Sequence, residues 1–224
     1  MENWTELARA VTPEGDELVL RQRGSDYDIR FNGWELMSTR SAVSEAALAR
    51  SVVAELNRTP ERVLVGGLGM GYTLRAVLDT VASGSTIIVA ELVPAVIDWV
   101  RGPLAGLARR PLDDPRVAIR VGGVAEVLAG DSDRFDAILL DTDNGPEVVM
   151  REANRLLYEE AGVDLVARAL RPGGVAGYWS ADRSAAFEAI LTGAGGAWRR
   201  IDVDARGGSA GPEHTLYLIR SRDA

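Results

Sequence analysis

The stretch "VLVGGLGMGYTL", residues 63–74, places three alternating glycines between a short apolar run and a helical pattern. Glycines at the carboxyl end of a parallel strand let the backbone turn tightly and let a ligand approach the main-chain amides. Gly67, Gly69 and Gly71 therefore predict a strand, a ligand-binding loop and a helix, in that order. A tight turn that holds no ligand is the alternative, because this glycine spacing alone is weak evidence.

Strand-like and helix-like segments alternate from residue 62 onward. The expected strands are residues 62–67, 85–92, 116–123, 135–141, 174–180, 197–205 and 214–221. The expected helices between them are residues 72–81, 94–108, 125–129, 154–170 and 184–194. Apolar strands separated by helices predict an α/β fold, a doubly wound, mostly parallel sheet of seven strands. Only the turn-rich residues 206–213 join the last two strands, which predicts an antiparallel pair at one sheet edge.

The N-terminal part has a different pattern. Residues 17–37 contain two or three short strand-like runs, broken by "RGSD" and by the Asn32-Gly33 pair, which is a strong hairpin signal. A helix over residues 43–56 then follows, with Ser44 as a plausible cap. We therefore expect a small β-hairpin region at residues 1–42 and a ligand-binding catalytic domain at residues 43–224.

The composition excludes several kinds of chemistry. The 224 residues include no cysteine and one histidine, so a disulfide framework, a thiolate nucleophile and a histidine-built metal site are not expected. A net charge of -8 argues against nucleic acid as a partner. Every apolar run is shorter than the roughly 20 residues of a membrane span, and "MENWTELARA" lacks the features of a signal peptide. These features predict a cytoplasmic protein without a membrane partner.

Two acidic residues follow strands at the same edge of the predicted sheet. Glu91 ends the second strand, 20 residues beyond Gly71, where an acidic side chain typically accepts hydrogen bonds from ribose hydroxyls. A helix-capping or surface carboxylate before Pro94 is the alternative. Asp141 closes the apolar strand "FDAILLD" and is expected to face the crevice in which such sheets bind ligands.

Together these residues resemble the spermidine synthase family, aminopropyltransferases built on the fold of class I S-adenosylmethionine-dependent methyltransferases. The segments that match occur in the family's order: Ser44-Glu45 where the family has Asp-Glu, "VLVGGLGMG", "VAELVPAVI", "DDPRVAIRVGG", "FDAILLD" and "LRPGG". The resemblance implies a methyltransferase-like Rossmann fold and a cosubstrate that is S-adenosylmethionine or its decarboxylated form. It also implies aminopropyl or methyl transfer to a small, cationic amine, no metal, and a homodimer.

The resemblance assigns roles to individual residues. Those expected at the cosubstrate are Gly67, Leu68, Gly69, Met70, Gly71, Glu91, Leu92, Gly123 and Val124. Asp141 and Asp143 are the catalytic candidates, since a carboxylate can orient an ammonium and take its proton as nitrogen attacks. Asn144 belongs to the same loop and is a candidate substrate-binding residue. Tyr72 directly follows the glycine loop and Tyr158 follows the "DNGP" loop, so both are candidate substrate residues, with packing as the alternative.

The chain also departs from the family pattern. The family reads "GGGDG", whose Asp binds the amine of the decarboxylated cosubstrate, and this chain has Met70 there. Gly123 replaces an Asp that contacts adenine in the family, and Leu48-Ala49-Arg50 replaces "YHE". The catalytic-loop pattern "DSxDPxGP" is shortened to "DTDNGP", residues 141–146. These changes leave the acceptor and the transferred group open.

Two other functions stay open. A nicotinamide-dependent oxidoreductase would also use a glycine loop and an acidic residue, but the G-x-G-x-G spacing and the absence of lysine argue against it. A catalytically inactive adenosyl-ligand-binding protein is the second alternative, favoured by Met70 and Gly123. For His214, a surface or edge-strand position is a better interpretation than a general base.

Overall fold

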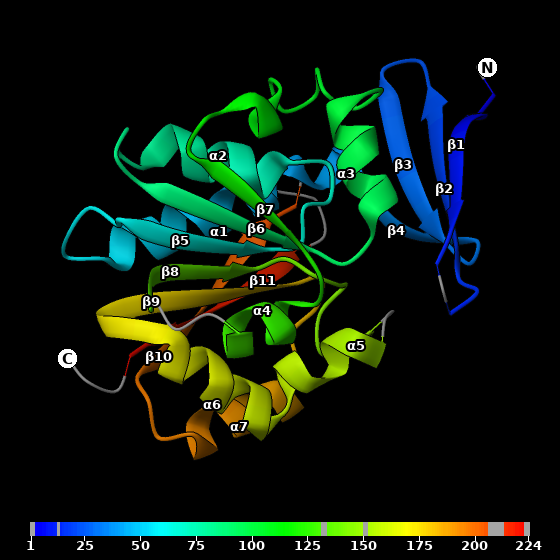
Figure 1. Cartoon of the computed structure of the whole chain (residues 1–224). Helices are drawn as coiled ribbons and strands as arrows, with labels where there is room; N and C mark the ends of the chain where they lie inside the picture. The colour runs from blue at the N-terminus through cyan, green and yellow to red at the C-terminus, as the bar shows by residue number, and fades with distance from the viewer. Residues whose placement is uncertain (1–2, 13, 131–133, 150–151, 206–212, 222–224) are drawn as a thin grey trace.

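The computed structural model describes residues 3–12, 14–130, 134–149, 152–205 and 213–221. A small antiparallel sheet formed by the N-terminal residues stands beside a larger mixed sheet that carries helices on both faces (Figure 1). The larger sheet confirms the predicted doubly wound α/β class. Within the described ranges, no helix is both long enough and apolar enough to cross a membrane.

The larger sheet has seven strands in the spatial order β10-β11-β9-β8-β5-β6-β7. The strands are β5 (Arg62–Gly66), β6 (Thr86–Glu91), β7 (Val117–Val121), β8 (Phe135–Leu140), β9 (Leu170–Ser180), β10 (Trp198–Asp204) and β11 (Glu213–Arg220). In the centre, Leu64 of β5 pairs in parallel with Ile88 of β6 and Ile138 of β8. Strand β11 runs antiparallel to β9 and β10, and β10 lies at the edge, as the sequence predicts. Most of the turn expected between β10 and β11, residues 206–212, lies outside the described residues.

Helices cover both faces of this sheet. They are α1 (Ala42–Glu55), α2 (Tyr72–Thr80), α3 (Pro94–Arg101), α4 (Val124–Gly130), α5 (Glu152–Arg155), α6 (Glu160–Ala169) and α7 (Ala185–Gly193). Among the described residues, three 3-10 turns accompany them: η1 (Thr39–Ser41), η2 (Pro111–Asp113) and η3 (Leu156–Tyr158). One hydrophobic cluster joins α1, α2 and α3 to one face, and a second joins α4, α6 and α7 to the other. The strands are apolar along their length because both faces are covered.

Two helices differ from the sequence-based expectation. The helix expected over residues 94–108 ends at Arg101, because Gly102 leaves the helical region (φ -104, ψ -110) and a proline follows it. The helix expected over residues 154–170 is divided at Glu159, which is extended. This break lets α6 approach η3 so closely that a Cβ at Gly162 would collide with the backbone of Leu156.

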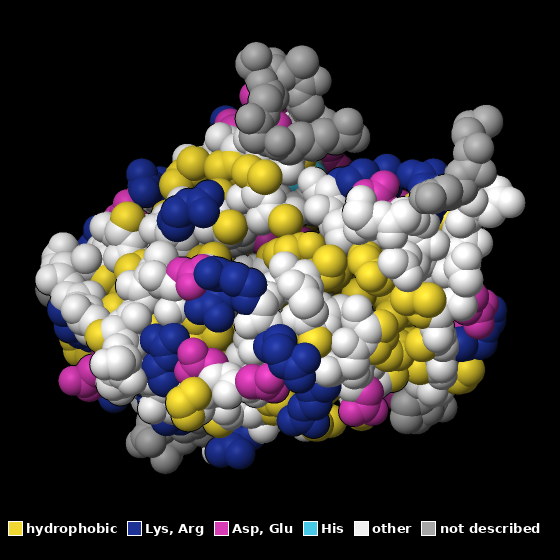
Figure 2. All heavy atoms as spheres, turned by 90° about the horizontal axis from the view of Figure 1, so that it is seen from above, with side chains coloured by type: hydrophobic (Ala, Val, Ile, Leu, Met, Phe, Trp, Pro, Cys, Tyr) yellow, Lys and Arg dark blue, Asp and Glu magenta, His cyan; other side chains and the backbone are white. Residues whose placement is uncertain are grey.

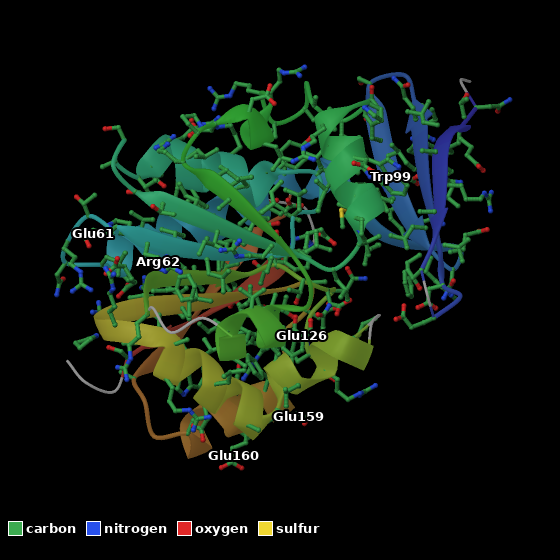
Figure 3. The ribbon with its side chains drawn as sticks, viewed as in Figure 1. Glu61, Arg62, Trp99, Glu126, Glu159 and Glu160 are labelled. Atoms are coloured by element: carbon green, nitrogen blue, oxygen red, sulfur yellow. The ribbon has the colours of Figure 1, made fainter. Side chains whose placement is uncertain are left out.

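The N-terminal region is a four-stranded antiparallel sheet rather than a β-hairpin. Its strands are β1 (Thr5–Val11), β2 (Glu17–Arg23), β3 (Asp26–Phe31) and β4 (Trp34–Ser38), paired in that order. The sequence analysis missed β1 because most of its side chains are exposed, so no buried alternation marks it. Leu20 and Ile29 belong to the hydrophobic cluster of α1 to α3, and Trp99 lies on α3 toward this sheet (Figure 3). A domain boundary between residues 42 and 43 stays a prediction.

The topology brings distant segments to one edge of the larger sheet. The parallel strands β5, β6 and β8 all end there. Strand β11 begins there, because it runs antiparallel to β9 and pairs Thr215 with Ser180, the last residue of β9. Chain segments that follow residues 66, 91, 140 and 180, and the segment that precedes residue 215, therefore share this edge.

Candidate active site

The glycine loop between β5 and α2 depends on three left-handed residues. Gly67, Gly69 and Gly71 have φ values of 87, 53 and 88, a region that residues with a Cβ avoid. A Cβ at Gly67 would also collide with the main-chain carbonyl of Asp141. The loop can therefore lie against the end of β8 only with glycine at position 67, and this contact brings Asp141 beside the loop.

Glu91 ends β6 and holds the loop from its other side. Its side chain is buried, and its two carboxylate oxygens accept hydrogen bonds from the backbone N–H groups of Leu68 at 2.9 Å and Val93 at 2.8 Å. These two hydrogen bonds connect the end of β6 with the glycine loop and with the residue before α3.

A small cavity of about 50 Å³, which we call the glycine-loop cavity, opens beside Glu91. It is lined by Leu18, Leu36, Met37, Gly67, Gly69, Ala90, Glu91, Leu92, Val93, Val96, Gly122, Val124, Asp141, Thr142 and Asn154. Five predicted cosubstrate residues are in this lining: Gly67, Gly69, Glu91, Leu92 and Val124.

Four other predicted cosubstrate residues do not line either of the two cavities at this edge. The side chains of Leu68 and Met70 are in the hydrophobic core, and Gly71 packs against Pro111 and Ala108. Gly122 lines the cavity in place of Gly123, whose backbone N–H donates to the Glu126 carboxylate at 3.2 Å. Glu126 lies on α4 at this side of the sheet (Figure 3).

A larger cavity of about 260 Å³, which we call the acidic cavity, adjoins the first. It is lined by Glu35, Leu36, Met37, Ser38, Glu45, Gly69, Asp141, Thr142, Asp143, Asn144, Val148, Trp179, Ala181, Asp182 and His214. Five of these residues are acidic, and His214 is the one basic residue among the described residues in the lining. Asp141 and Thr142 line both cavities.

Asp141 and Glu45 form a carboxyl pair in the acidic cavity. Burial raises the pKa of Asp141 to about 6, an effect partly opposed by the Thr73 hydroxyl, which donates to Asp141 Oδ2 at 2.6 Å. Burial, and then the charge of Asp141, raise the pKa of Glu45 well above its ordinary value. Asp141 is therefore the more readily ionised member of the pair. The sequence analysis did not select Glu45, although the Ser44-Glu45 match to the family pattern marked its position.

The remaining predicted residues occupy different places. Asp143 is buried and accepts a 2.8 Å hydrogen bond from the side-chain amide of Asn154. Asn144 lines the acidic cavity, and its carbonyl accepts from the backbone N–H of Ala181. Tyr158 lines neither cavity, and burial raises the pKa of its hydroxyl, which lies 3.4 Å from Thr142 Oγ1.

Tyr72 is also outside the two cavities at the sheet edge. It lines a separate groove between α1 and α2, together with Arg50 and Arg75. Burial and the nearby Glu45 raise the pKa of its hydroxyl. Both Tyr72 and Tyr158 stay predictions as substrate residues, and neither side chain is in the cavity lining.

His214 has a position that the sequence analysis did not expect. It is 8% exposed rather than on the surface, and it lies on β11, which is an inner strand of the sheet. Its Nδ1 is 2.8 Å from the hydroxyl of Ser44, which also accepts a 3.1 Å hydrogen bond from Trp179 Nε1. The imidazole and indole rings pack edge to face with centroids 4.7 Å apart. No periodic pattern in the sequence signals this contact between residues 44, 179 and 214.

The family model of the spermine/spermidine synthase domain matches residues 44–182. The chain belongs to the spermine/spermidine synthase family. The matched segment starts in α1 and ends just after β9, so it contains the glycine loop, Glu91, and the loop that begins at Asp141. In the described part of the chain, no group of three acidic or histidine side chains is arranged to hold a metal ion.

The relatives that match this chain include methyltransferases and aminopropyltransferases. Putrescine N-methyltransferase 2 of Nicotiana attenuata is 36% identical over 119 residues, which cover 52% of this chain and 30% of the relative. Spermine synthase of Arabidopsis thaliana is 35% identical over 120 residues, covering 52% and 31%. Polyamine aminopropyltransferase of Mycobacterium tuberculosis (strain CDC 1551 / Oshkosh) is 31% identical over 163 residues, covering 71% and 30%. The chain spans about three tenths of the length of these relatives.

Solved structures agree with the fold of the family. A spermidine synthase in complex with the transition-state analogue AdoDATO has a TM-score of 0.80, with 98% of this chain and 74% of that chain covered at 18% identity. An O-methyltransferase from Bacillus cereus in complex with SAH has a TM-score of 0.55, with 80% and 81% covered at 16% identity. At these identities the likeness establishes the methyltransferase-like fold.

Proposed function

We propose that this chain transfers a carbon group from an adenosyl sulfonium cosubstrate to the nitrogen of a small cationic amine. The observation that carries the proposal is the position of Asp141, which lines both the glycine-loop cavity and the acidic cavity. A group at this junction can touch the attacking nitrogen of one molecule and the reacting carbon of the other. Holding two reactants in that geometry is a large source of rate enhancement.

The lining of the glycine-loop cavity is one reason to propose an adenosyl ligand. Glu91 is buried at the end of β6, the position at which an acidic side chain of such a sheet accepts hydrogen bonds from ribose hydroxyls. Two of the structural relatives were solved with adenosyl compounds, a spermidine synthase with AdoDATO and an O-methyltransferase with SAH. We propose S-adenosylmethionine or its decarboxylated form as the cosubstrate here.

The acidic side chains that line the second cavity are the reason to propose an amine acceptor. Its carboxylates attract an ammonium group, and the ionised Asp141 can accept a proton from the nitrogen. The neutral nitrogen then attacks the carbon next to the sulfonium. The new C–N bond forms as the C–S bond breaks, and the bonding electrons leave with sulfur as a neutral thioether. Burial and the charge of Asp141 raise the pKa of Glu45, so Asp141 is the member of this pair that is more readily ionised and thus free to accept the proton.

The residue at position 70 bears on which group is transferred. By family resemblance an Asp at this position binds the amine of the decarboxylated cosubstrate, whereas Met70 is a fully buried core side chain. We therefore propose a weaker preference for the decarboxylated form over intact S-adenosylmethionine than in an ordinary spermidine synthase. Asp143, which lines the acidic cavity, is the candidate for a replacement contact.

The test is a turnover assay with mass-spectrometric detection of the product. The chain is incubated with putrescine and either S-adenosylmethionine or its decarboxylated form, and N-methylputrescine and spermidine are measured. Asp141→Asn is the matched control, because it preserves the shape of the side chain and removes the charge. Calorimetry with both cosubstrates, methylthioadenosine and NAD separates this proposal from an oxidoreductase and from an inactive adenosyl-binding protein.

We further propose a cytoplasmic homodimer that does not bind nucleic acid. The net charge of -8 disfavours polyanions, and arginine and acidic side chains are interspersed on the face seen in Figure 2. Sedimentation at micromolar concentration tests the assembly. A single species of 24.0 kDa would contradict the homodimer.

A further inference from the structure

We infer that His214 is a specificity-determining residue of the acidic cavity, whose Nε2 accepts a hydrogen bond from the end of the acceptor remote from the attacking nitrogen. This inference rests on the proposed function, because it assumes that the cavity receives an amine. It assigns Ser44 and Trp179 as positioning residues that fix the imidazole ring.

The first argument is the hydrogen bonding of the ring. Nδ1 is engaged by the Ser44 hydroxyl at 2.8 Å, whereas Nε2 has no hydrogen-bond partner among the described residues. His214 lines the acidic cavity, so Nε2 is the ring nitrogen left for a ligand. Ser44 is itself fixed, since it is fully buried and receives the Trp179 indole N–H.

The second argument is the charge of the ring and its surroundings. Asp182, which follows β9, and Asp204 of β10 act on the ring, and four further acidic residues line the same cavity: Glu35, Glu45, Asp141 and Asp143. Burial lowers the pKa of His214, and Asp182 and Asp204 oppose this effect only in part. At neutral pH the imidazole is uncharged, so it does not repel a cationic acceptor and can accept one of its N–H groups.

The third argument is the placement of His214 relative to Asp141. Asp141 follows β8 and His214 lies on β11, and β9 separates these strands. Neighbouring strands are about 4.8 Å apart, so the two backbones lie roughly 10 Å from each other across the sheet. Trp179 of β9 lines the same cavity between the two strands. An acceptor with one nitrogen at Asp141 can thus lay its methylenes on Trp179 and reach His214 with its other end.

Accepting an N–H at Nε2 requires that the proton of the neutral ring be on Nδ1. The ring then donates Nδ1–H to Ser44 Oγ, which has two acceptor lone pairs and can also take the Trp179 N–H. The inference therefore includes a specific tautomer, with a bare Nε2 facing the cavity.

The experiment uses the fact that the chain contains one histidine. In untagged, nitrogen-labelled protein, the imidazole NMR signals belong to His214 without further assignment. Methylthioadenosine is added first, and the protein is then titrated with putrescine or with butylamine, which has the same carbon chain and lacks the second nitrogen. We expect a bare Nε2, a large Nε2 shift and a lower His214 pKa with putrescine, and little change with butylamine. An Nε2–H tautomer in the putrescine complex, or equal shifts with both amines, overturns the inference.

Kinetics supply a second, independent measurement. In His214→Phe, which retains a ring against Trp179, we expect KM for putrescine to rise about tenfold or more and KM for butylamine to change less than about twofold. Ser44→Ala should raise KM for putrescine by a smaller factor and shift the tautomer signal. If the wild type alkylates neither amine, the proposed function fails, whereas the NMR titration still decides the role of His214. If the wild type is active and His214→Phe has the same ratio of KM values for butylamine and putrescine as the wild type, the proposed function stands and only this inference is wrong.

Discussion

Replacement of Asp141 by Asn should make the fold more stable at neutral pH while it removes catalysis. The pKa of Asp141 is raised from 3.8 to about 6, chiefly by burial. Between these two values the folded protein holds a proton that the unfolded chain has released. Stability is therefore expected to fall as the pH rises through this window, and the full cost of the buried charge is present above it.

The size of the effect follows from the pKa difference. A difference of about 2 units corresponds to about 3 kcal/mol, and the partial access of the cavity to solvent reduces this to about 1–3 kcal/mol. Asn keeps a carbonyl oxygen that can accept the 2.6 Å hydrogen bond from Thr73, so little packing energy is lost. The assay is urea unfolding of both proteins near pH 8 and near pH 4. We expect the full gain near pH 8 and a much smaller one near pH 4, where the folded state keeps its proton and the unfolded carboxyl has only begun to lose it.

Glu35→Gln is the matched control for this experiment. Glu35 lines the same cavity, but both of its oxygens accept hydrogen bonds from the Arg40 guanidinium at 2.9 Å. Removing a paired charge should give no stabilisation. The reasoning is refuted if Asp141→Asn destabilises the protein near pH 8, or if its effect is the same at both pH values. A gain of equal size in Glu35→Gln would show that general charge repulsion, rather than burial of Asp141, is the cause.

Three further predictions concern turnover, the cosubstrate and the glycine loop. Asp141→Asn should lower kcat by about 10²- to 10⁴-fold with little change in adenosyl-compound affinity, measured by steady-state kinetics and calorimetry; retained turnover would exclude it as the base. Glu91→Ala removes two charge-assisted ligand contacts and should weaken methylthioadenosine binding at least tenfold by calorimetry, whereas an unchanged Kd would place the ribose elsewhere. Gly67→Ala combines a positive φ with a collision against Asp141, so it should lower the unfolding free energy by about 1–3 kcal/mol or more. The control Gly84→Ala, where a Cβ has open space, should change it by less than about 0.5 kcal/mol.

Sequence patterns predict the larger sheet well because its signal is local. Each parallel strand is a short apolar run, and each is followed by a helix or a glycine loop, so the order of elements follows directly from the chain. The same argument fails for β1, where exposed side chains leave no periodicity to detect. It fails again at Arg101, where the apolar helical pattern continues through a Gly-Pro step that ends the helix.

The residues of the site also fall into those that sequence patterns predict and those that they do not. Gly67, Glu91 and Asp141 are found from sequence because each ends or directly follows a strand, and strand ends of a parallel sheet share one edge. Glu45 and His214 come from a helix and from the last strand, far from that pattern in the chain. Only the packing of α1 and β11 against β9 brings them to the cavity, and no local spacing encodes that packing. For Met70 the opposite holds, since its place in the glycine motif suggested a ligand contact and its apolar side chain is buried in the core.

Ser44, which stands where the family pattern has Asp, affects the charge of the acidic cavity. An Asp at that position, as in the family pattern, would place a carboxylate beside His214 Nδ1, and an adjacent negative charge favours the imidazolium form. The cavity would then contain a fixed cation at the wall that faces an incoming amine. Serine makes the same kind of hydrogen bond without a charge, so burial outweighs the opposing effect of Asp182 and Asp204 and keeps the pKa of His214 below its ordinary value. Serine at position 44 thus allows the buried imidazole to act as a hydrogen-bond acceptor toward the cationic acceptor that we propose for this cavity.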